Sequence, residues 1–62
     1  MKFHTFNAVN GNNEVLKTIF ISANESKMNA FKLASAKLSF AYGNQSVFLK
    51  LEYTGIKERE LA

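Results

Sequence analysis

The chain has 62 residues, of which 47% are hydrophobic and 13% aromatic, and its formal net charge is +3. It has no Cys, no Asp and a single His, so its composition excludes a disulfide framework, a Cys/His zinc site and Asp-rich calcium loops. A domain this short buries only about 60% of the surface that its unfolded chain exposes. We therefore expect no cofactor, and we expect a partner, either a second copy or another molecule, to help stabilise the fold.

The first predicted element is a β-hairpin, because Asn10-Gly11 separates two segments rich in Phe, Val, Ile and Thr, residues 2–9 and 14–22. A turn of even length places Phe3 on one face of the hairpin, whereas a turn of three residues exchanges the faces of one strand. We favour the even turn because it gathers lysines and His4 on one face, which we expect to point away from the helix. With that turn, the first face holds Phe3, Leu16, Thr18 and Phe20, and the outer face holds Lys2, His4, Phe6, Val15, Lys17, Ile19, Ile21 and, from a later strand, Lys50.

A helix is expected next. Ser22-Ala23-Asn24-Glu25 fits a capping box, with Asn24 as a competing cap. Gly43-Asn44 is typical of a helix end. The apolar stripe between them has spacings of three and four residues and comprises Ala30, Phe31, Ala34, Leu38, Ala41 and Tyr42.

The third predicted strand alternates, with Val47, Leu49, Leu51 and Tyr53 toward the helix. The pleat would then point Phe48 and Lys50 away from it. Residues 56–62 are expected to form a charged tail or a short helix, which leaves residues 1–55 as a single domain. The predicted architecture is α+β, in the order β-β-α-β, with a three-stranded antiparallel sheet of strand order 3-1-2 and one helix packed on one face.

The residues contain no arrangement of a nucleophile and a base, so we expect a protein that is not an enzyme, with His4 as a surface residue. An outer face with Phe6 and Phe48 would be an exposed apolar patch, which usually marks an interface. Aromatic rings beside lysines suit either base stacking with phosphate neutralisation or the seam of a homodimer, and the sequence leaves both open. The candidate partner-binding residues are Phe6, Lys17, Phe48 and Lys50 on this face and Lys27, Lys32 and Lys37 on the helix.

No apolar run is long enough to span a membrane, and residues 1–4 lead directly into a strand pattern. We therefore expect a cytoplasmic protein without a membrane partner.

The hairpin, the helix with the Ala30/Ala34/Ala41 spacing, the Gly43-Asn44 end and the alternating strand resemble small inhibitor proteins of bacteriophages and mobile elements, anti-CRISPR proteins among them. The resemblance implies a non-enzymatic protein in the host cytoplasm that inhibits a defence nucleoprotein complex by occupying a protein or nucleic-acid-binding surface. It makes Lys27, Lys32, Lys37 and Lys50 the natural contact residues. A basic nucleic-acid-binding module and a homodimeric interaction domain are the alternative functions.

Overall fold

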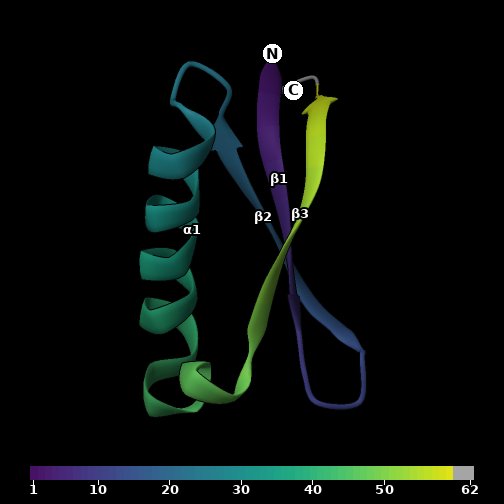
Figure 1. Cartoon of the computed structure of the whole chain (residues 1–62), viewed down its shortest axis with the longest axis vertical. Helices are drawn as coiled ribbons and strands as arrows, with labels where there is room; N and C mark the ends of the chain where they lie inside the picture. The colour runs from purple at the N-terminus through teal and green to yellow at the C-terminus, as the bar shows by residue number, and fades with distance from the viewer. Residues whose placement is uncertain (60–62) are drawn as a thin grey trace.

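The computed structural model describes residues 1–59, and its chain order is β-β-α-β as predicted. The elements are β1 (Lys2–Val9), β2 (Val15–Ser22), α1 (Lys27–Tyr42), a 3-10 helix η1 (Gly43–Phe48) and β3 (Lys50–Glu58). The three strands form one antiparallel sheet in the order β2-β1-β3, with β1 in the centre (Figure 1). This order is the predicted 3-1-2 counted from the other edge, so the α+β fold and its strand order are confirmed.

The hairpin register confirms the turn of even parity, because Phe3 pairs with Ser22 and Phe6 pairs with Ile19. The direction of the two faces is opposite to the prediction. Phe6 is 0% exposed and packs with Ile19 and Ile21 under the helix. The predicted outer apolar patch is thus the core, and burying this face leaves Asn7 and Thr18, which share the opposite face with Phe3 and Phe20, in contact with water.

The core is narrow, since the helix contributes mainly small side chains to it. Ala30, Ala34 and Leu38 are the buried residues of α1. The two alanines let the helix axis approach the sheet closely, and α1 packs on β2 and β1. Phe40, near the end of the helix, is 95% exposed and contributes nothing to the core.

The helix begins later than the capping box predicts. Ser26 is the N-cap, and its hydroxyl accepts a hydrogen bond from the backbone N–H of Asn29 at 3.1 Å. Ser22 instead accepts from the N–H of Asn24 at 3.2 Å and stabilises the turn that precedes the helix. The predicted end is confirmed, because α1 stops at Tyr42 and Gly43 has a φ of 60°.

The third strand also begins later than predicted. Val47 and Phe48 belong to η1, so the alternation starts at Leu49, and the pleat does not govern the direction of Phe48. At its other end β3 runs through Ile56 to Glu58, where a tail or short helix was expected. The backbone N–H of Arg59 donates to the carbonyl oxygen of Met1 at 2.9 Å and extends the pairing with the start of the chain. The remaining residues of the predicted tail, 60–62, lie outside the described residues.

No helix within residues 1–59 is long and apolar enough to cross a membrane.

Replacing Phe6 with Ala should cost about 3 to 5 kcal/mol, because the ring is fully buried between sheet and helix. A domain of this size rarely has more than about 3 to 5 kcal/mol to lose, so the variant should be unfolded at 25 °C by circular dichroism. The matched control, Phe40→Ala, should change the free energy of unfolding by less than about 0.5 kcal/mol. A cooperative melt of Phe6→Ala near that of the wild type would contradict this description of the core.

Candidate functional site

An apolar hollow lies between α1 and β3, where the helix leaves the inner face of the third strand half-covered. Its volume is about 520 Å³ near the start of the helix, and it continues toward η1. We call this surface the α1–β3 groove. Its lining residues are Phe6, Lys27, Met28, Phe31, Lys32 and Tyr53 near the start of α1, and Leu38, Val47, Leu49 and Leu51 toward η1.

Helical geometry places the groove beside the core. At about 100° per residue, Phe31 lies close to Leu38 around the helix axis but about 100° from Ala30, on the side of the helix that faces β3. Its ring meets that of Phe6 edge-on, with centroids 6.0 Å apart. Tyr53 approaches the same Phe6 ring from β3 at 5.2 Å. Three aromatic rings therefore form the floor and one wall of the groove.

The groove exposes apolar side chains that a small protein normally covers. Met28 is 74% exposed, Phe31 48% and Val47 78%. The charged residues at its rim are lysines: the Nζ atom of Lys27 lies 4.5 Å from the centroid of the Tyr53 ring, and Lys32 lines the same hollow. The groove is thus apolar inside and basic at its rim.

His4 fixes the position of Tyr53. The hydroxyl of Tyr53 lies 2.9 Å from Nδ1 of His4, and Nε2 lies 2.7 Å from the carbonyl oxygen of Glu25. A neutral imidazole that donates from Nε2 and accepts at Nδ1 satisfies both contacts. His4 is buried, so the expectation of a surface histidine was wrong. Glu52 of β3 pairs with Asn7 on the opposite face of the sheet and lies away from this contact.

The predicted partner-binding residues do not form one surface. Lys27 and Lys32 line the α1–β3 groove, whereas Lys37 lies on the other flank of the helix, beside β2. Lys17 and Phe48 are exposed on β2 and η1. Lys50 pairs with Val9 on the face of the sheet away from the helix, and Phe6 is part of the core.

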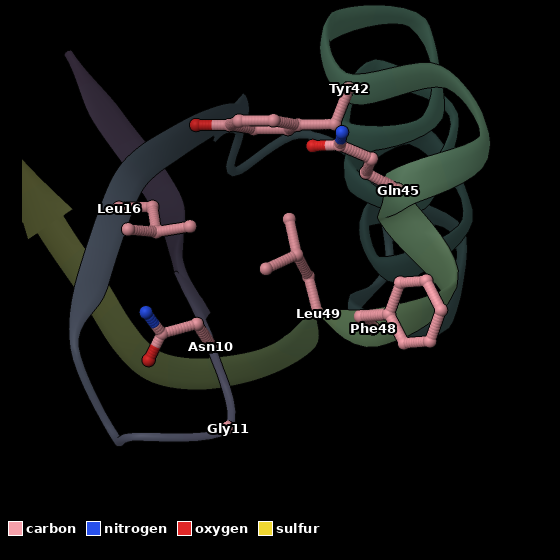
Figure 2. A pocket seen from close by; sticks show the side chains of 7 residues that line it. All are labelled: Asn10, Gly11, Leu16, Tyr42, Gln45, Phe48 and Leu49. Atoms are coloured by element: carbon pink, nitrogen blue, oxygen red, sulfur yellow. The ribbon is translucent and has the colours of Figure 1, made fainter.

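Phe48 borders a second hollow, between the hairpin turn and η1. Figure 2 shows Leu16 and Leu49 pointing into this space, with the ring of Tyr42 across it. Leu16 was expected on the same face as Phe3, Thr18 and Phe20. The strand register shifts between Ala8 and Val9, so Leu16 lies at the irregularity and points into this hollow instead. Asn10 closes the turn, since its Oδ1 atom accepts from the backbone N–H groups of Asn12 and Glu14. The polar side of Asn10 is therefore used within the turn, and Gln45 of η1 adds a second polar group to the lining.

The face of the sheet away from the helix carries a second group of aromatic and basic residues, which we call the open face. Phe3 and Phe20 meet edge-on with centroids 6.1 Å apart, and the guanidinium carbon of Arg59 lies 4.2 Å from the centroid of the Phe20 ring. Lys57 is paired with Phe3, and Lys50 lies farther along the same strand. The sequence did not predict this group, because Arg59 was assigned to a tail.

Residues 1–59 contain no group of three or more His, Cys, Asp or Glu side chains that could hold a metal ion. Comparisons with protein-family models, curated proteins and solved structures gave no significant match to this chain. The geometry of its surfaces is therefore the basis for the function proposed below.

Tyr53→Phe should lower the free energy of unfolding by about 1 to 3 kcal/mol, because the buried Nδ1 atom of His4 loses its hydrogen-bond donor. Urea titration followed by circular dichroism measures the change. The control is Tyr42→Phe, since the hydroxyl of Tyr42 makes no hydrogen bond to another residue of the described range, and its effect should stay below about 0.5 kcal/mol. Equal losses in the two variants would contradict the role assigned to Tyr53.

Proposed function

We propose that this chain is a non-enzymatic binding protein that docks a protein partner in the α1–β3 groove. The observation that supports the proposal is the exposed apolar lining around Met28 and Phe31, which forms one continuous surface instead of scattered side chains. Contiguous apolar patches rimmed by polar residues are typical of protein interaction sites. The expected partner presents an apolar ridge, flanked by acidic groups that face Lys27 and Lys32.

The specific role proposed is the one implied by the resemblance to small bacteriophage inhibitors: the chain would block a host defence nucleoprotein complex by covering one of its protein surfaces. The β-β-α-β order and the small size support this role. Docking of this kind requires no catalytic group, and the only histidine has both ring nitrogens engaged within the fold.

Site-specific cross-linking tests where a partner docks. With p-benzoylphenylalanine in place of Met28, irradiation in the native cells should give a discrete protein adduct, because position 28 lies in the groove and is exposed. The control carries the same group in place of Thr18, which is exposed and pairs with Asn7 on the open face. Nuclease treatment before analysis should leave the adduct of position 28 unchanged.

Adducts from position 18 alone, or from neither position, would contradict docking in the groove. Loss of the position-28 adduct after nuclease treatment would also contradict it, because the partner would then be held through a nucleic acid.

The open face supports a second candidate function, the binding of single-stranded nucleic acid. Phe3 and Phe20 offer rings on which bases stack, and Arg59, Lys57 and Lys50 offer charges for phosphates. Three cations neutralise few phosphates, so this function predicts weak binding with a log–log salt slope of about −2.

Fluorescence anisotropy with a single-stranded oligonucleotide tests this candidate. Phe20→Leu preserves apolar packing but removes the stacking ring, so it should weaken binding by about tenfold, in line with about 1 to 3 kcal/mol per stacked base. Lys37→Glu, on the far flank of the helix, is the charge control and should have a much smaller effect. A loss for Lys37→Glu as large as that for Phe20→Leu, or no loss for Phe20→Leu, would contradict the open face as a specific site.

A further inference from the structure

The groove lies beside an unpaired strand edge. Within residues 1–59, β3 is an edge strand of the sheet, so its outer edge carries backbone N–H and C=O groups without a neighbouring strand. The other edge strand, β2, differs, because Ile19 and Ile21 of its inner face are buried beneath α1. On β3 the inner-face residues Leu51 and Tyr53 are only partly buried. β2 exposes Val15 and Leu16 at its start, next to the hairpin turn, whereas β3 combines a free edge with an incompletely covered apolar face beside the groove, along residues 49–53.

The segment from Leu49 to Tyr53 is regular. Leu49 has extended backbone angles, with φ −108° and ψ 147°, and leads directly into β3. The register with β1 is continuous from Val9–Lys50 to Phe6–Tyr53, and it shifts only beyond Tyr53, where Gly55 is the next paired residue. The backbone N–H of Leu49 donates to the carbonyl oxygen of Ser46, so residues 50–53, with the Leu49 side chain beside them, are available to pair with another strand before the irregularity.

The charged residues of this segment can pair with those of the same segment in a second copy. Lys50 pairs with Val9 and Glu52 with Asn7, so both lie on the open face, opposite to Leu51. In an antiparallel pair of two identical strands, a two-fold axis through Leu51 places Lys50 of each copy opposite Glu52 of the other. The same register places Leu51 opposite Leu51 and Leu49 opposite Tyr53 on the apolar face. It creates two attractive charge pairs and no repulsive one.

The alternative register that crosses the irregularity is less favourable. Placing Glu52 opposite Lys57 also brings Lys50 opposite Arg59, so that attractive and repulsive pairs cancel. This register also places the irregular segments of the two strands, just beyond Tyr53, opposite each other at the two-fold axis.

We infer that the functional unit is a two-fold homodimer in which the β3 strands of two copies pair through residues 49–53. The two sheets become one continuous sheet, with both α1 helices on the same face. Each α1–β3 groove then opens onto the groove of the other copy, so the docking site is a single trough with a helix on either side. The inference rests on the proposed function, because it makes the second copy contribute one wall of that same site.

Charge reversal on the full chain tests the dimer. Lys50→Glu makes both cross-strand pairs acidic and Glu52→Lys makes both basic, so each variant alone should dimerise at least about tenfold more weakly than the wild type. Both side chains are exposed, so circular dichroism should show unchanged folding. A mixture of the two variants should form a heterodimer, because both of its charge pairs are attractive. One pair joins the two substituted side chains, and the other joins the native Glu52 of one copy to the native Lys50 of the other. Lys17→Glu on β2 is the matched control and should leave dimerisation unchanged.

Sedimentation equilibrium of the wild type and variants, with native mass spectrometry of the mixture, gives the result. A monomeric wild type at about 100 µM, well above the dissociation constant expected for a standard interface, overturns the dimer. A mixture that dimerises no better than its components, or sensitivity to Lys17→Glu in place of Lys50→Glu, also overturns it. A monomer that still gives a foreign adduct from position 28 refutes the dimer but leaves the groove as the docking site. A dimer whose only foreign adducts come from position 18 refutes the proposed function instead.

Discussion

The structure depends on one constraint: a single helix is too narrow to cover a three-stranded sheet. α1 packs on β2 and β1 through Ala30, Ala34 and Leu38, and the two alanines draw it close to those strands. Close packing of the helix there leaves the third strand with its apolar residues partly exposed. The α1–β3 groove, its basic rim and the free strand edge are consequences of this placement.

The sequence was sufficient to predict the order of the elements, the strand order and the parity of the hairpin, because glycines, period-two alternation and helical spacing are local signals. It was insufficient to decide which face of the hairpin meets the helix. β2 is apolar on both faces, so the pattern alone does not choose between Phe6 with Ile19 and Phe3 with Phe20. Because lysines share the face of Phe6 and Ile19, we expected that face to point away from the helix, and this expectation was wrong. Lys17 stays exposed although it lies at the edge of the well-covered core.

The candidate site was harder to predict because it depends on packing between distant elements. Phe31 was grouped with the core stripe, but of that stripe only Ala30, Ala34 and Leu38 are buried. The contact between His4 and Tyr53 joins residues that are 49 positions apart, and it requires the β1–β3 register. The two alanines in the helical stripe were the available signal, since small residues indicate close approach and hence limited coverage of the sheet.

The central claim is that the edge and inner face of β3 need a partner to be covered. Hydrogen–deuterium exchange of the full chain at low and high protein concentration tests it most directly, with residues 15–18 of β2 as the internal reference. Amide protection within residues 49–53 should rise with protein concentration, while that of residues 15–18 should not change. Protection of residues 49–53 that is independent of concentration, or a rise confined to β2, would show that β3 needs no partner.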